Sequence, residues 1–216
     1  MDSTLRARLN EAAGRGAVAS SGDVVIPATV DGLAAAVRVC DETGTRIRVS
    51  SGADAGEKAD GGVVLSLKRM KAVSAAPAQL TLRAEAGATV DEVRRAAQQA
   101  RLAVVGLGTA RAQHVGSLIA RGEVPRRALC GVEAVLPGGE QVRFGGGVLK
   151  DVVGYDLPAL LLGSMGRLAL ITAVTFRLEP ESARTPVSPP PGPAPEAAHA
   201  LVAAAFDPQG LLQPGT

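Results

Sequence analysis

Aromatic residues are almost absent from this sequence: they make up 2% of the chain, with no Trp, one Tyr and three Phe. Proteins that read single-stranded nucleic acid stack the bases on aromatic rings, so this absence excludes that class of partner. An excess of one charge is also missing, because 23 Lys and Arg stand against 21 Asp and Glu. This balance predicts neither a dominant polyanionic partner nor a polybasic membrane anchor.

Long apolar runs are missing as well. No stretch reaches the roughly 18 to 20 apolar residues of a membrane helix, so no integral membrane segment is predicted. The start of the chain lacks the apolar core of a signal peptide, which predicts a cytoplasmic location. The two cysteines, Cys40 and Cys130, form no C-x-x-C motif and are predicted to be reduced thiols rather than a disulfide. His114 and His199 lie far apart, so no metal site is predicted.

The first part of the chain alternates between strand and helix patterns. Short apolar strands are predicted at Val24–Ile26, Arg46–Val49 and Val63–Leu67. Between the first two, Thr29 is a typical helix cap and Gly44 a typical helix stop. This order predicts a small parallel sheet with a helix packed against it.

The second part of the chain has longer strands and a hairpin. Leu80–Ala84 and Leu168–Leu178 have strand character, and Thr89–Glu92 is a capping box that begins a helix. Pro137–Glu140 is a hairpin turn between two strand patterns, and Asp156–Leu162 predicts one or two helical turns. A second, mostly antiparallel sheet is therefore expected.

These patterns predict an α+β fold class with two lobes, at about residues 1–76 and 77–180. Nine of the 14 prolines lie from residue 180 onward. Residues 181–195 are accordingly predicted to be an extended Pro-rich linker, and residues 196–216 a C-terminal tail.

Standard nucleotide-binding motifs are incomplete. Gly106–Arg111 lacks the last glycine of a dinucleotide fingerprint, and Gly145–Lys150 lacks the Ser or Thr of a phosphate loop. Gly154, Gly163 and Gly166 would allow a flat or anionic ligand to approach the backbone, but plain turns are the more common explanation of such glycines.

Four stretches nevertheless resemble one known family. Lys150–Leu157 reads KDVVGYDL, and Leu160–Thr172 reads LLLGSMGRLALIT. Leu129–Glu140 has a matching hairpin sequence, and Phe206–Gly215 reads FDPQGLLQPG. Together they resemble the FAD-binding subunit of glycolate oxidase, within the group of vanillyl-alcohol oxidase and p-cresol methylhydroxylase (PCMH).

This resemblance implies a two-lobed PCMH-type FAD-binding domain that holds non-covalent FAD between its lobes. A loop of small residues would expose backbone N–H groups to the pyrophosphate. A second wall, an arginine corner and a glycine turn would contact the rest of the cofactor. The residues implied in cofactor binding are Ser51, Gly52, Ala53, Asp54, Ala55, His114, Val115, Gly116, Ser117, Arg127, Gly166 and Ile171.

The departures from the family also carry expectations. The Asp54 carboxylate stands where a pyrophosphate would sit and opposes its charge. The Pro-rich segment stands in the place of the family's substrate-covering cap domain, so the chain is expected to be inactive alone. The implied partners are the flavin and iron–sulfur subunits of a complex similar to glycolate oxidase, and any membrane contact would be made through them.

Two readings therefore remain open from the sequence. One is an FAD-binding subunit of a multi-subunit 2-hydroxyacid oxidoreductase, and the other a degenerate flavin-domain fold that serves as an assembly subunit. Tyr155 and Lys150 are either a proton-handling pair near the flavin or ordinary turn residues, and no catalytic residue is assigned.

Overall fold

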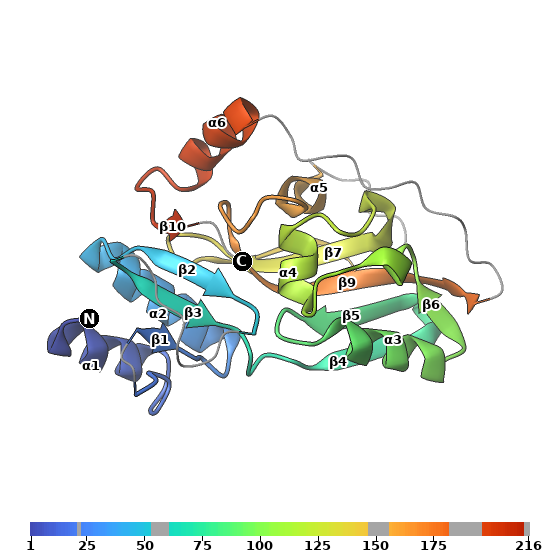
Figure 1. The fold of residues 1–216 in the computed structure, drawn as a ribbon, viewed down its shortest axis with the longest axis horizontal. Helices are drawn as coiled ribbons and strands as arrows, with labels where there is room; N and C mark the ends of the chain where they lie inside the picture. The colour runs from blue at the N-terminus through green and yellow to red at the C-terminus, as the bar shows by residue number, and fades with distance from the viewer. Residues whose placement is uncertain (21–22, 53–60, 147–155, 182–195, 214–216) are drawn as a thin grey trace.

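The computed structural model describes residues 1–20, 23–52, 61–146, 156–181 and 196–213. Two sheets lie side by side, and each has its own hydrophobic cluster (Figure 1). The helices are α1 (Ser3–Ala12), α2 (Val30–Thr43), α3 (Val90–Gln99), α4 (Val115–Ala120), α5 (Leu157–Leu161) and α6 (Glu196–Phe206), with short 3-10 turns η1 (Pro77–Gln79), η2 (Leu107–Thr109) and η3 (Arg126–Ala128). The strands are β1 (Val24–Val25), β2 (Ile47–Ser50), β3 (Val63–Ser66), β4 (Val73–Ala76), β5 (Thr81–Glu85), β6 (Leu102–Val104), β7 (Leu129–Val135), β8 (Gln141–Gly145), β9 (Leu170–Pro180) and β10 (Leu212–Gln213).

The first sheet is parallel, with the strand order β1-β3-β2-β10. Helix α2 packs against it with a buried face that includes Leu33, Val37 and Cys40. The Thr29 hydroxyl accepts the N–H of Gly32 at 3.1 Å, and Gly44 adopts the left-handed conformation, with φ of 61°. The predicted start and end of this helix are thus confirmed.

The end of the chain joins this first sheet. Leu212 of β10 pairs in parallel with Ile47 of β2, although the sequence pattern suggested only a tail beyond the Pro-rich segment. Asp207 fixes the turn before β10, because its carboxylate oxygens accept the N–H groups of Leu211 at 2.9 Å and Leu212 at 2.7 Å. A strand of two residues has no periodicity, which is why the sequence did not predict it.

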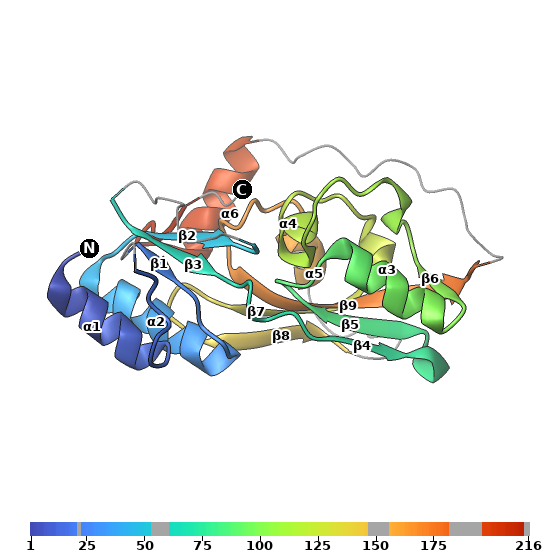
Figure 2. The ribbon, with the colours of Figure 1, turned by 60° about the horizontal axis from the view of Figure 1, so that its bottom comes forward.

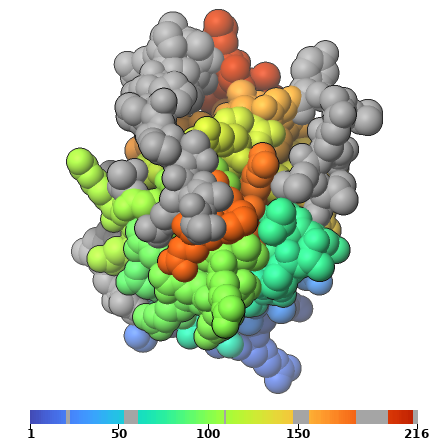
Figure 3. Space-filling view, turned by 90° about the vertical axis from the view of Figure 1, so that its right-hand side faces the viewer, coloured from blue at the N-terminus to red at the C-terminus, as the bar shows by residue number. Residues whose placement is uncertain are grey.

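The second sheet is antiparallel, with the order β4-β5-β9-β7-β8, and β6 pairs with the far end of β9. In the space-filling view the orange residues at the end of β9 lie against the green residues of the second lobe (Figure 3). Helices α3 and α4 lie on one of its faces (Figure 2). The predicted capping box begins α3, since Thr89 and Glu92 exchange hydrogen bonds. The observed sheets confirm the predicted α+β class. β4 pairs with β5, so the antiparallel sheet begins before residue 77, where the second lobe was expected to start.

The hairpin between β7 and β8 connects the two lobes. Its turn reaches α2, where the Arg38 guanidinium donates to the carbonyl oxygen of Gly139 at 3.0 Å. A Cβ at Gly139 would lie 2.8 Å from the carbonyl oxygen of Ala34, so only glycine allows this approach. Gln141 donates to Asp31 of α2 at 2.7 Å. These contacts fix the position of one lobe against the other.

Candidate cofactor-binding cleft

A cleft lies between the two lobes, at the carboxyl ends of β2 and β3. Ligands bind at this edge of parallel sheets because the connecting loops diverge there. The space that water-sized molecules can occupy in the cleft is about 30 Å³. Its lining comes from the ends of β2 and β3, from α4, and from the turn that leads into β9: Val49, Ser51, Leu67, Gly116, Ser117, Ala120, Gly166, Ala169 and Ile171.

This lining combines two hydroxyl groups with apolar walls. The Ser51 and Ser117 hydroxyl oxygens lie 3.5 Å apart, and Ser51 is buried. Aliphatic side chains such as Val49, Leu67 and Ile171 form the walls. None of the described lining residues ionises between pH 2 and 12. This part of the cleft can therefore bind and orient a ligand, but it offers no acid or base.

Two glycines allow the lobes to meet closely at the cleft. A Cβ at Gly52 would overlap the imidazole ring of His114. A Cβ at Gly116 would overlap the Ser51 hydroxyl and would lie 3.2 Å from the Cβ of Ala86. The predicted first loop and second wall thus touch each other through Gly52–His114 and Ser51–Gly116.

Backbone hydrogen bonds hold the first turn of α4 in place. The N–H of Val115 donates to the carbonyl oxygen of Ala88 at 2.9 Å, and the N–H of Gly116 donates to that of Ala86 at 2.8 Å. The Val115 side chain is fully buried in the core of the second lobe. Val115 therefore supports the cleft from behind and does not line it.

The turn before β9 forms the opposite edge of the cleft. Met165 and Gly166 are both left-handed, with φ of 55° and 74°, and this conformation is strained for methionine. The N–H of Met165 donates to the carbonyl oxygen of Ala120 at 2.9 Å, which ties the turn to α4. The Ser164 hydroxyl is fully buried and has no hydrogen-bond partner among the residues that the structure describes. A buried hydroxyl without a partner is unusual, and this one lies two residues before Gly166, which lines the cleft.

Arg127 is not among the residues that line the cleft. Its side chain is exposed on η3, whereas the neighbouring Ala128 is buried, and its implied contact with the cofactor stays a prediction. Arg126 instead binds Asp156 at 2.6 Å, and this contact lowers the pKa of that carboxyl group. Ala53, Asp54, Ala55, Lys150 and Tyr155 lie outside the described residues.

Four lining residues did not appear among the predicted ones. Val49 and Leu67 lie at the carboxyl ends of strands that the sequence did predict, so the rule for parallel sheets could have indicated them. Ala120 follows Gly116 by one helical turn, and Ala169 precedes Ile171 by two positions. Both spacings place the residue on the same face as a predicted one.

Comparison with known families shows the family of this chain. Residues 23–145, more than half of the chain, match the family described as FAD binding domain. This chain belongs to the FAD-binding domain family. FAD is its cofactor, and the matched residues include both sheet edges that form the cleft from Val49 to Ala120. In the described part of this FAD-binding domain, no group of His, Cys, Asp and Glu has the arrangement of a metal site, and no helix has the length and apolarity needed to cross a bilayer.

Curated relatives include flavin-linked oxidoreductases. The domain is 49% identical over 57 residues to an uncharacterized FAD-linked oxidoreductase of Mycobacterium tuberculosis. The aligned stretch covers 26% of this chain and 12% of the relative. It is 43% identical over 58 residues to the glycolate oxidase subunit GlcD of Bacillus subtilis, and this alignment covers 27% of this chain and 12% of that protein. The glycolate oxidase subunit GlcE of Escherichia coli is 38% identical over 55 residues, with coverage of 26% and 16%. The domain thus matches less than a fifth of the length of these relatives.

Solved structures share the fold. The grass pollen allergen Phl p 4, which has glucose dehydrogenase activity, superposes with a TM-score of 0.60 at 20% identity, over 83% of this chain and 40% of that one. A variant of berberine bridge enzyme superposes with a TM-score of 0.59 at 17% identity, over 73% and 34%. Both similarities establish a PCMH-type fold, as the sequence resemblance implied.

The residues of the cleft fit a flavin dinucleotide. The hydroxyls of Ser51 and Ser117 suit a polar part such as the pyrophosphate or ribityl chain, and the walls formed by Leu67, Ala169 and Ile171 suit a flat ring.

Proposed function

We propose that this domain is the FAD-binding subunit of a multi-subunit oxidoreductase that acts on a 2-hydroxy acid such as glycolate. The similarity to two glycolate oxidase subunits, together with the cleft between the lobes, is the observation that carries the proposal. When bound, FAD accepts the two electrons that leave the hydroxyl-bearing carbon of the substrate.

The residues of this chain would bind and position the cofactor. Ser51 and Ser117 would hold its polar part, and the glycine turn at Gly166 would allow its ring to approach the backbone. Ala53, Asp54 and Ala55 would complete the first loop, and His114 would set the distance between the loop and α4. Because the described lining has no ionisable group, the base that accepts the substrate proton would come from elsewhere in the complex.

Partner chains would complete the enzyme. The domain corresponds to a small part of its curated relatives, and an oxidoreductase needs a dry pocket over the flavin to position its substrate. We infer that a flavin subunit and an iron–sulfur subunit supply the pocket and the path for electrons. A cytoplasmic complex, attached to the membrane only through its partners, follows from the same proposal.

Activity measurements with and without partners test the proposal. The FAD-loaded chain alone is expected to give no glycolate-dependent or lactate-dependent dye reduction, and the reaction should appear when the partner subunits are added. Turnover by the isolated chain at ordinary enzyme rates, on the order of 10 per second, would overturn the subunit assignment. A complex that is equally active without this chain would refute its role in the enzyme.

A further inference from the structure

Although positive and negative charges nearly balance over the whole chain, one segment is strongly basic. Residues 93–132 contain seven arginines, no lysine, and a single acidic residue, Glu123. A solvated surface ordinarily mixes both signs of charge. The seven are Arg94, Arg95, Arg101, Arg111, Arg121, Arg126 and Arg127.

These arginines lie on the side of the second sheet that α3, α4 and η3 cover. The opposite face of that sheet is different, because Arg83 alternates with the buried Leu82 and Ala84 and so points away from the helices. On that face Arg83 binds Glu133 at 2.7 Å, and Glu133 lies 4.0 Å from Arg143. Charges are therefore paired on the open face of the sheet, whereas on the helical side the segment 93–132 itself carries seven arginines and one carboxylate.

Two of the seven arginines are satisfied within the protein. Arg94 binds Asp91 at 2.8 Å and also donates to the carbonyl oxygen of Leu107 at 3.2 Å. Arg126 binds Asp156. Neither side chain needs a partner from outside.

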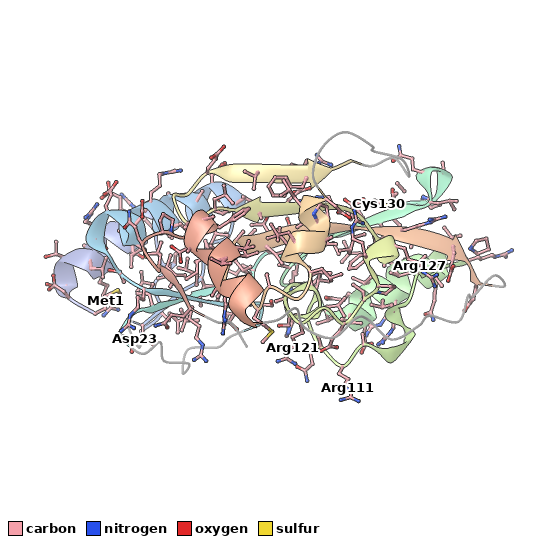
Figure 4. The ribbon with its side chains drawn as sticks, turned by 90° about the horizontal axis from the view of Figure 1, so that it is seen from above. Met1, Asp23, Arg111, Arg121, Arg127 and Cys130 are labelled. Carbon is pink, nitrogen blue, oxygen red and sulfur yellow. The ribbon has the colours of Figure 1, made fainter. Side chains whose placement is uncertain are left out.

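Arg111 and Arg121 are in a different position. Both are exposed, and Figure 4 shows them close together and pointing in the same direction, away from the sheet. The acidic residue near them, Glu123, uses one carboxylate oxygen to accept the N–H groups of Arg111 at 2.6 Å and Ala112 at 2.8 Å. Its other oxygen lies 3.9 Å from the Arg121 guanidinium, a weak contact. The Glu123 carboxylate is thus occupied mainly by backbone N–H groups and makes one weak contact with a guanidinium group, that of Arg121.

This pair of arginines also adjoins the cleft. Arg121 directly follows Ala120, which lines the cleft, and Ala120 accepts the N–H of Met165. Met165 is 39% exposed, one of few large apolar side chains on the described surface. A charged pair beside an exposed apolar side chain is a typical composition for a protein interface, in which Arg and Met are enriched.

We propose that Arg111 and Arg121, with Met165 beside them, form a docking surface for an acidic face of a partner protein chain. This inference rests on the proposed function, in which a partner covers the cleft. Guanidinium groups match carboxylates in a bidentate geometry, which favours an acidic protein surface. Single-stranded nucleic acid is disfavoured by the lack of aromatic residues for stacking, and an anionic membrane by the dispersal of the basic residues over several elements.

An acidic polypeptide serves as the probe for this surface. Fluorescently labelled poly-L-glutamate is titrated with the full chain at low ionic strength and again at roughly 0.3 M salt. We expect binding that weakens with salt, and at least about a tenfold loss of affinity in Arg111→Glu/Arg121→Glu. The matched control is Arg6→Glu/Arg15→Glu, which makes the same charge change at exposed arginines in and beside α1. The control should bind within about twofold of the unaltered chain.

Several results would overturn the docking surface. These are the absence of binding by the unaltered chain at low salt, an equal loss in both double variants, and tighter binding to phosphatidylserine vesicles or duplex DNA than to poly-L-glutamate. FAD retention, measured by visible absorbance, should be the same in Arg111→Glu/Arg121→Glu as in the unaltered chain, and its loss would place these residues in the cofactor site instead. The two proposals can fail separately. If neither the unaltered chain nor the variants bind FAD but the poly-L-glutamate titration gives the expected result, the docking surface stands and the proposed function fails.

Discussion

At the scale of single residues, contacts between Gly52, His114, Ser51 and Gly116 decide how closely the two walls of the cleft approach. The sequence resemblance named all four, and the structure shows how they meet: each glycine accepts a side chain from the opposite wall. Neither glycine needs a left-handed backbone for this, because positive φ values occur at other glycines. Space, and not conformational freedom, is therefore the reason for glycine at these two positions.

The contact between Gly52 and His114 can be tested with a pair of substitutions. Gly52→Ala should destabilise the fold by about 1–3 kcal/mol, because the added methyl group overlaps the imidazole ring. The second change in Gly52→Ala/His114→Ala removes the ring and should restore most of that loss. Urea denaturation of both variants, with His114→Ala alone as the control, measures the coupling. Additive effects of the two changes would show that the ring does not press on Gly52.

At the scale of single residues, the sequence did not predict some features that depend on the tertiary fold. The family motif indicated Arg127 by its position, but the exposure of its side chain beside the buried Ala128 is a property of the tertiary fold that the motif does not give. Cys40 lies in the first lobe, where burial raises the pKa of its thiol to about 12, and Cys130 lies half-buried in β7. The distance between the two cysteines in space depends on the tertiary fold, and their spacing in the sequence does not determine it.

At the scale of elements, the patterns with strong local signals were predicted correctly. The caps of α2 and α3 and the hairpin of β7 and β8 depend on residues within four positions of each other, so local sequence was sufficient. β10 was missed because its two residues are held by the buried Asp207 carboxylate and by pairing with β2, far away in the chain.

The role of Asp207 gives a prediction for the end of the chain. Asp207→Ala should destabilise the fold by about 2 kcal/mol, because the buried N–H groups of Leu211 and Leu212 lose their charged acceptor. Hydrogen exchange should then rise in Ile47–Ser50, which pairs with β10. Gln209→Ala, an exposed change in the same turn, is the control and should leave both quantities unchanged. Unaltered exchange at β2 in Asp207→Ala would mean that β10 does not support the first sheet.

The second sheet gives a prediction about pH. The hydrogen bond from Arg83 is the main cause that lowers the pKa of Glu133 below its ordinary value of 4.5. The stabilisation from this pair is therefore complete above pH 4.5 and is lost as the pH falls through the lower pKa of the folded state. Glu133→Gln should cost about 1 kcal/mol near neutral pH, a small value because the pair is partly exposed to solvent, and the cost should shrink in acid.

Unfolding free energies of Glu133→Gln and the unaltered chain, measured from pH 3 to pH 7, check this dependence. Glu140→Gln on the exposed hairpin turn is the control and should show no such trend. A cost for Glu133→Gln that stays constant down to the lowest pH would contradict the ion-pair account.

At the scale of the whole molecule, two lobes create a binding edge that neither has alone. The sequence predicted both lobes and, through family resemblance, FAD between them. It could not predict that the β7–β8 turn would rest on α2, because this contact joins residues about 100 positions apart. The sequence also did not predict that β10 would extend the first sheet by pairing with β2, the strand that ends directly before Ser51.

The central claim is that the cleft between the lobes binds FAD, and an equilibrium titration of the full chain with FAD, followed by visible absorbance, tests it most directly. We predict saturable binding of one FAD per chain. Ala120→Leu, which adds three carbons at the cleft lining, should weaken the affinity by about tenfold or more, equivalent to about 1.4 kcal/mol. Ala96→Leu on α3, away from the cleft, should bind like the unaltered chain. Absence of a bound flavin spectrum, or equal affinity of Ala120→Leu and the unaltered chain, would contradict the account.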